Sequence, residues 1–129
     1  MKNPTFKEQY DKIVTAYLKN ELNPMSCRAC FVGNLLNNNN AWAGYGLNAE
    51  ECIQKEVNGF YSVVDIRRLE SEFMLTNKHV WYSPNGNILD ENYLYDAMER
   101  TLLVLKQIHE SKGEIVEDYQ FTKRELQTA

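Results

Sequence analysis

The segment from Ser26 to Asn37 constrains the fold most, because it has almost no polar face. It holds a single charged residue and two of the three cysteines in the chain. A helix that is apolar nearly all round is normally buried inside a domain. The small residues Ala29, Cys30 and Gly33 would let neighbouring elements approach it closely. The sequence therefore predicts a buried central helix over about 27–37.

Amphipathic patterns lie on both sides of this segment. Apolar residues recur at steps of three and four over about 4–20 and over about 91–111, which predicts two long helices. We expect both helices to pack against the central one. Shorter apolar stripes predict helices from about 48 to 57 and from about 62 to 75. A looser pattern over 114–126 predicts a frayed final helix.

The connecting segments are rich in turn-forming residues. Four asparagines at 37–40 predict a helix end and a loop, because asparagine tolerates the left-handed backbone conformation. The segment 41–46 has two glycines and two large aromatic residues, and we expect it to fold back on the core. A β-prone stretch and a proline-containing turn predict a small β-hairpin near 79–89.

Length and composition fit one mainly helical domain over residues 1–129, with five to six helices round the central one. A chain of 129 residues can bury a core without a disulfide framework, and 43% apolar content is near the globular norm. No stretch approaches the ~20 apolar residues that span a bilayer. The N-terminal residues lack the apolar core of a signal peptide. With an odd number of cysteines, these features predict a cytoplasmic protein with reduced thiols.

The charge of the chain narrows the classes of function. A net charge of −4 and the absence of a basic run argue against direct nucleic-acid binding, which depends on Lys and Arg. An acidic surface favours basic partner surfaces through electrostatic steering. We therefore expect a small acidic protein that binds another protein and has no catalytic activity. Aromatic residues dominate binding hot spots. The candidates for such a surface are Trp42, Tyr45, Trp81 and Tyr82.

The motif Cys27-x-x-Cys30 allows three interpretations. Free cysteines are usually small buried hydrophobic residues, and we expect this for both thiols. A zinc site would need two further ligands. The remaining candidates for such ligands are Cys52, His79 and His109. Alternatively, Cys27 is a reactive thiol, activated by a helix N-terminus and by Arg28. We expect no metal and no cofactor.

If the protein is an enzyme, the residues that predict catalysis are Cys27 and His79. A cysteine hydrolase needs a histidine within hydrogen-bond reach and a third group that orients it. A cysteine at a helix start followed by a histidine on a strand resembles papain-like peptidases. Those folds have several strands after the helix, whereas this sequence predicts two short ones. The second histidine, His109, is expected near the C-terminal end of the long helix, either on the surface or facing the helix dipole.

The central segment also resembles a group of small uncharacterised phage and bacterial proteins. The similar residues are Ala29 and Cys30 with Gly33, which match an Ala-Cys-x-x-Gly helix. In those proteins a helix of the type Ser-Val-Val-Asp-Ile, here residues 62–66, follows a loop of glycines and aromatic residues. The resemblance covers about a dozen residues. It implies a phage or mobile-element origin and brings no activity with it.

Overall fold

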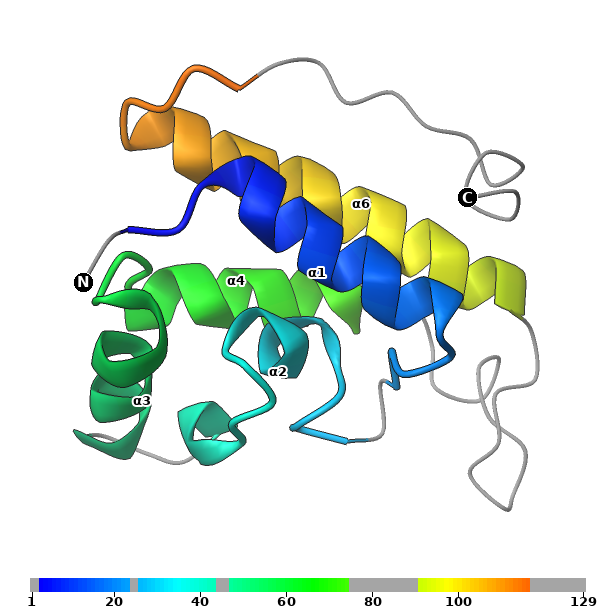
Figure 1. Ribbon diagram of the computed structural model, residues 1–129, viewed down its shortest axis with the longest axis horizontal. Helices are drawn as coiled ribbons and strands as arrows, with labels where there is room; N and C mark the ends of the chain where they lie inside the picture. Colours follow the sequence, from blue (N-terminus) through cyan, green and yellow to red (C-terminus); the bar gives the residue numbers. More distant parts are fainter. Residues whose placement is uncertain (1–2, 24–25, 44–46, 75–90, 117–129) are drawn as a thin grey trace.

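The structure, a computed structural model, describes residues 3–23, 26–43, 47–74 and 91–116. These residues form five α-helices and one short 3₁₀ helix, and they contain no strand (Figure 1). The elements are α1 (Phe6–Leu18), α2 (Phe31–Leu35), η1 (Ala41–Ala43), α3 (Leu47–Val57), α4 (Val63–Phe73) and α6 (Glu91–Ser111). The prediction of a mainly α fold is confirmed. No helix in these ranges has the length and apolar character needed to cross a membrane.

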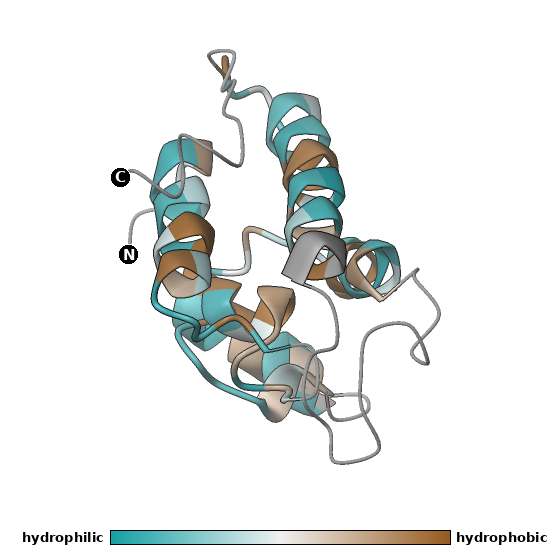
Figure 2. Ribbon diagram, turned by 90° about the vertical axis from the view of Figure 1, so that its right-hand side faces the viewer, coloured by the Kyte–Doolittle hydropathy of each residue, from teal (hydrophilic) through white to brown (hydrophobic). Residues whose placement is uncertain are grey.

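Three amphipathic helices, α1, α4 and α6, form the frame of the molecule. Both α1 and α4 pack on α6 and run in the opposite direction to it (Figure 1). Hydrophobic and hydrophilic residues alternate round these helices, so that each has one buried face (Figure 2). The buried apolar stripe of α6 consists of Leu94, Ala97, Met98, Leu102, Leu105 and Ile108. The helices predicted over 4–20, 62–75 and 91–111 are therefore present.

Two capping boxes fix where α1 and α4 begin. The Thr5 side chain accepts a hydrogen bond from the backbone N–H of Glu8, whose carboxylate accepts in return from Thr5 N. Ser62 and Asp65 make the same reciprocal pair at the start of α4. Each box satisfies two backbone N–H groups that have no partner within the helix. This is why α1 begins after Thr5, two residues later than the pattern predicts.

The central segment is buried as expected, but its helix is shorter than predicted. Residues 30–36 are all buried, yet α2 begins only at Phe31, and Cys30 is its N-cap. The residues before Cys30 form turns that fold back against the helix. The packing prediction is also wrong in part, because the main neighbours of α2 are α1 and α4 rather than α1 and the long helix α6.

Asparagine side chains hold the loop after α2. Asn37 and Asn38 both have positive φ angles, 58° and 63°, which few other residues adopt without strain. The amide of Asn37 donates to Glu56 Oε1 at 3.1 Å, and that of Asn39 donates to Glu56 Oε2 at 2.9 Å. The predicted loop is confirmed. These bonds fasten the loop to α3.

Two predictions fall on other parts of the chain. The β-hairpin predicted near 79–89 is not supported, because it lies outside the described residues and the described ranges contain no strand. Of the helix predicted over 114–126, residues 114–116 are not helical. The rest of that segment also lies outside the described ranges.

Candidate functional site

A small cleft lies between η1, α3 and α4. Its volume is about 180 Å³. Four of its lining residues are buried and mostly apolar side chains: Trp42, Ala49, Ile53 and Ile66. Val63, Arg67 and Glu70 also line it and are more exposed, so they stand at its mouth. We call this feature the Trp42 cleft. Buried apolar side chains form its inner wall, and the charged residues Arg67 and Glu70 stand at its mouth.

Trp42 forms one wall of the cleft and is held in place from two directions. Its indole Nε1 donates a hydrogen bond of 2.9 Å to the carbonyl oxygen of Cys27. The Asn39 side chain accepts from the backbone N–H of Ala41 at 2.9 Å, which starts η1. Only 6% of Trp42 is exposed. Trp42 thus folds back on the core, as expected for the segment 41–46, and it contributes to the site as one wall of the cleft.

The first turns of α4 carry the rim of the cleft. Val64 does not line the cleft itself, but it lies next to Val63, which does, and it is 75% exposed. Arg67 lies three residues later, on the same face of the helix. Its guanidinium makes no hydrogen bond or ion pair within the described ranges. The next residue, Arg68, instead donates to Gln107 at 3.0 Å. Arg67 thus has its full hydrogen-bonding capacity available at the mouth of the cleft.

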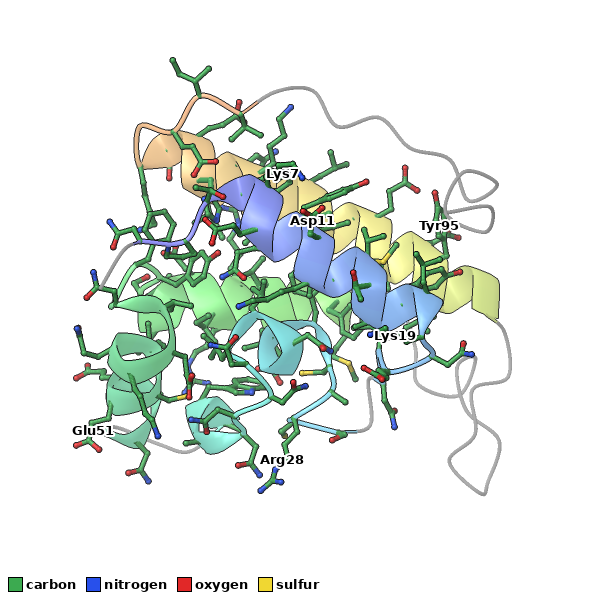
Figure 3. The ribbon with its side chains drawn as sticks, in the orientation of Figure 1. Lys7, Asp11, Lys19, Arg28, Glu51 and Tyr95 are labelled. Atoms are coloured by element: carbon green, nitrogen blue, oxygen red, sulfur yellow. The ribbon has the colours of Figure 1, made fainter. Side chains whose placement is uncertain are left out.

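A second, more open groove of about 390 Å³ follows α1 and the asparagine loop. Most of its charged groups are already engaged, Glu21 being the exception. Asp11 pairs with Lys7 at 2.9 Å, on the outer face of α1 (Figure 3). Lys12 donates to Asn37 Oδ1 at 2.8 Å, and partial burial lowers the pKa of its amine. This groove therefore offers few free groups to a ligand.

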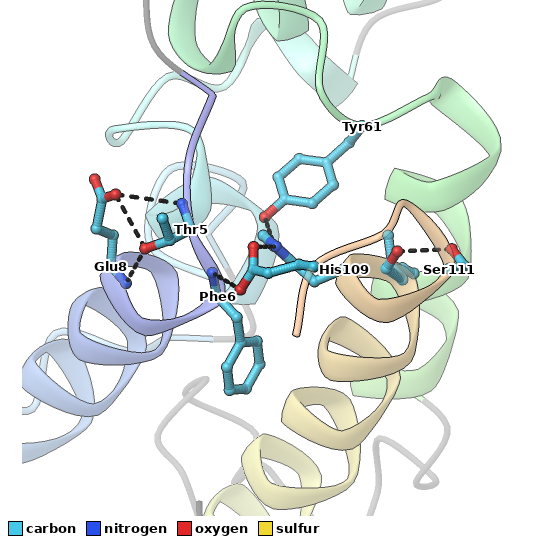
Figure 4. Close-up of polar contacts among 8 residues, drawn as sticks. Thr5, Phe6, Glu8, Tyr61, His109 and Ser111 are labelled. Atoms are coloured by element: carbon cyan, nitrogen blue, oxygen red, sulfur yellow. Dashed lines mark hydrogen bonds and ion pairs between the residues drawn. The ribbon is translucent and has the colours of Figure 1, made fainter. Parts of the chain in front are cut away.

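A buried polar cluster joins three distant parts of the chain (Figure 4). The Tyr61 hydroxyl lies 2.7 Å from His109 Nε2, and His109 Nδ1 lies 2.9 Å from Glu114 Oε1. The other oxygen of Glu114 accepts from the backbone N–H of Phe6 at 2.9 Å. We call these four groups the His109 cluster. Neither Tyr61 nor His109 is open to solvent, so the expectation of a surface histidine is wrong.

The cluster has the order of groups found in catalytic triads, but Tyr61 and His109 are both closed off from solvent. Burial raises the pKa of the Tyr61 hydroxyl and lowers that of the His109 imidazole. The hydrogen bonds of the cluster join the start of α1, the turn before α4 and the end of α6. Phe60 packs with its ring centroid 4.7 Å from that of His109.

The cysteines do not share one environment. Cys30 is buried, as expected, and Cys52 is buried too, whereas Cys27 is exposed, so the expectation of a buried thiol is wrong for Cys27. Burial raises the pKa of the Cys30 thiol to about 11. Next to Cys27, the Arg28 side chain points away from the protein (Figure 3). His79 lies outside the described residues, so a catalytic pair of Cys27 and His79 stays a prediction. The same holds for Tyr45, Trp81 and Tyr82 as binding residues.

Neither a metal-binding cluster nor a similar protein points to a function. Within the described ranges, no three His, Cys, Asp or Glu side chains gather where they could hold a metal ion. Comparison with protein-family models, curated proteins and solved structures finds no match to the chain.

Sequence reasoning missed the exposed face of α4 beside the cleft, although a signal was present. Val63 and Val64 are adjacent apolar residues at the start of an amphipathic helix, so both cannot face the core. One of them must point outward, and Val64 does. The His109 cluster left no such signal, because its residues are spread over more than a hundred positions of the sequence.

Proposed function

We propose that the protein acts by binding another protein, without catalysis, and that the Trp42 cleft receives a side chain of the partner. The observation that carries this proposal is the combination of buried apolar side chains on the inner wall of the cleft with Arg67 at its mouth, which makes no hydrogen bond or ion pair within the described ranges. Binding hot spots are typically buried pockets filled by one large side chain and ringed by polar groups.

The size of the cleft favours a single side chain over a small-molecule ligand. Pockets for drug-sized molecules usually measure about 300–1,000 Å³. At about 180 Å³ the Trp42 cleft is smaller and suits one large apolar side chain. Val64 would extend the contact along α4, and Arg67 would pair with a carboxylate or carbonyl oxygen beside the inserted residue.

The wider setting is part of the same proposal. The net charge of −4 would steer a partner whose surface is basic overall, while Arg67 acts locally. Three free cysteines suit a reducing compartment, so we place the protein in the cytoplasm. The resemblance of the central segment supports a phage or mobile-element origin.

Selection of a randomised peptide library against the purified protein tests this function. We expect selected peptides to share one large apolar residue, and Arg67→Glu to weaken their binding at least tenfold in calorimetry. Arg28→Glu is the matched control, because it makes the same charge change at an exposed residue away from the cleft and should leave binding unchanged. If both variants bind equally well, the Trp42 cleft is not the binding site.

A further inference from the structure

We propose that Cys27 is an oxidation site and that Cys30 resolves it: a hydroperoxide oxidises the Cys27 thiol, and the disulfide that follows displaces Trp42. The observation behind this is an exposed thiol and a buried thiol within one turn of the chain. Disulfides in a reducing compartment are usually transient and serve redox sensing, which agrees with the cytoplasmic setting proposed above. The effect on binding at the Trp42 cleft rests on the proposed function, whereas the oxidation itself does not.

The turn before α2 holds the two cysteines close together. The backbone N–H of Cys30 donates to the carbonyl oxygen of Ser26 at 2.8 Å, which is the bond of one α-helical turn. The Cys30 thiol points back along this turn, and its Sγ lies 3.8 Å from the carbonyl oxygen of Cys27. Because Cys27 is exposed, its side chain can rotate toward Cys30 without displacing the core.

Exposure gives each thiol a different role. Oxidation of cysteine follows exposure, and redox-sensing cysteines often stand beside a second cysteine that resolves them. Cys27 is open to solvent, so it meets the hydroperoxide first. Burial raises the pKa of Cys30 to about 11, and a negative charge on the nearby Cys27 contributes to this shift. Cys30 therefore remains a thiol at neutral pH and reacts only with an oxidised neighbour.

The oxidation proceeds in two balanced steps. The Cys27 thiolate attacks one peroxide oxygen, so that an S–O bond forms, the O–O bond breaks and hydroxide leaves. Cys27 is then a sulfenic acid. In the second step the Cys30 sulfur gives up its proton and attacks the Cys27 sulfur; an S–S bond forms, the S–O bond breaks, and water leaves with that proton. Two thiols have lost two electrons, and the peroxide has been reduced to water.

The disulfide acts on Trp42 through the backbone of Cys27. Residues three apart in a helical turn have Cβ atoms about 5–6 Å apart, whereas a disulfide needs about 3.5–4.5 Å. Closing the bond therefore draws Cys27 toward Cys30. The Arg28 carbonyl cannot follow freely, because it packs on Gly33, where an ideal Cβ would lie 2.5 Å from it. The Cys27 carbonyl takes up the movement, and it carries the Trp42 indole, which donates to it at 2.9 Å.

Peptide mapping of the full chain tests the oxidation. The Cys52→Ser protein is treated with hydrogen peroxide, its remaining thiols are alkylated, and it is digested with trypsin. Trypsin cleaves after Arg28 and so places the two remaining cysteines on different peptides, 20–28 and 29–55. We expect these peptides to be joined by a bond that dithiothreitol breaks. Unlinked peptides, or a disulfide found only between two copies of the chain, would overturn the proposal.

The Cys30→Ser variant in the same Cys52→Ser protein separates the two steps. Serine is a favoured N-cap, so this variant keeps the start of α2 and should fold. Its Cys27 has no resolving thiol, so the sulfenic acid should persist. We expect dimedone, a reagent for sulfenic acids, to label Cys27 at least tenfold more than in the protein that keeps Cys30. Equal labelling of both proteins would show that Cys30 does not resolve Cys27.

Trp42 and a bound peptide report the effect on the cleft. The chain has two tryptophans, so the spectrum of Trp81→Phe assigns the indole proton of Trp42. Peroxide should shift this signal and weaken binding of a peptide selected against the reduced protein at least fivefold. Cys27→Ser is the control and should show neither change. An unshifted Trp42 signal, or equal affinity in the disulfide form, would overturn control of the cleft. Failure to select any peptide would contradict the proposed function alone, and the peptide map and the Trp42 signal would still decide this proposal.

Discussion

A methyl group at position 33 would collide with the backbone of the preceding turn. An ideal Cβ on Gly33 would lie 2.5 Å from the carbonyl carbon and oxygen of Arg28, and would also overlap the carbonyl oxygen of Cys27. Neither carbonyl is free to move. That of Cys27 accepts from the indole of Trp42, and that of Arg28 accepts from the Asn38 amide at 3.0 Å.

Gly33→Ala should therefore destabilise the protein although alanine is the better helix former. Helix propensity alone would favour the variant by about 0.5–1 kcal/mol. Overpacking against a fixed backbone typically costs about 1–3 kcal/mol, and we expect this effect to prevail. Denaturant unfolding of both proteins measures the difference. A Gly33→Ala protein that is more stable than the parent would show that the turn can move away.

The crowding at Gly33 could be predicted from the sequence, but the identity of the neighbour could not. Small residues in an apolar segment indicate a close approach without naming the other surface. In the predicted helix over 27–37, residues 27 and 28 belong to the same helix as Gly33. The sequence therefore predicts that the long helix over 91–111 is the close neighbour of Gly33. The structure caps α2 with Cys30, whose sulfur accepts from Gly33 N at 3.4 Å. Cysteine is an unusual cap, because Ser, Thr, Asp and Asn are the residues usually found at that position, so sequence rules do not predict a helix start at Cys30.

At the scale of elements, Glu56 links α3 to the loop that follows α2. Its carboxylate accepts from the amides of Asn39 and Asn37, and these hydrogen bonds lower its pKa. The loop in turn positions η1 and Trp42. Glu56 thus supports the wall of the Trp42 cleft that Trp42 forms, although Glu56 does not line the cleft itself.

Glu56→Ala should lower the free energy of unfolding by about 1 kcal/mol, a modest amount because the carboxylate is partly exposed to solvent. Glu56→Gln keeps an acceptor oxygen and should lose less. Because the folded pKa is lowered, the difference between Glu56→Gln and wild type should be present above the ordinary pKa of 4.5 and shrink as pH falls below it. Urea unfolding at several pH values measures this. A difference that is constant with pH would contradict the role of the charge.

The elements themselves were largely predictable, and their arrangement was not. Periodic apolar residues define which face of α1, α4 and α6 is buried, and Ser62 with Asp65 defines where α4 begins. The same pattern does not say which helix covers which face. The sequence pattern predicts that the long helix over 91–111 packs on the central segment. In the structure this helix, α6, packs mainly on α1 and α4. The site was harder still, since a cleft depends on how three elements meet.

At the scale of the whole molecule, the His109 cluster connects residues that are far apart in sequence. The bond from Phe6 N to Glu114 spans 108 residues, and that from Tyr61 to His109 spans 48. Most other bonds outside the helices join residues in the same turn or in neighbouring elements. The cluster is thus the main polar connection between the start of α1 and the segment that follows α6.

This span has a consequence for the order of events during folding. Bringing distant residues together costs loop-closure entropy, which is recovered only once the intervening helices have packed. We therefore expect the cluster to form after the rate-limiting step. Tyr61→Phe leaves the buried Nε2 of His109 without a donor, at a cost of about 1–3 kcal/mol. In stopped-flow measurements this cost should appear almost entirely as faster unfolding, with the refolding rate nearly unchanged. A refolding rate that falls in proportion to the lost stability would instead make the cluster part of the folding nucleus.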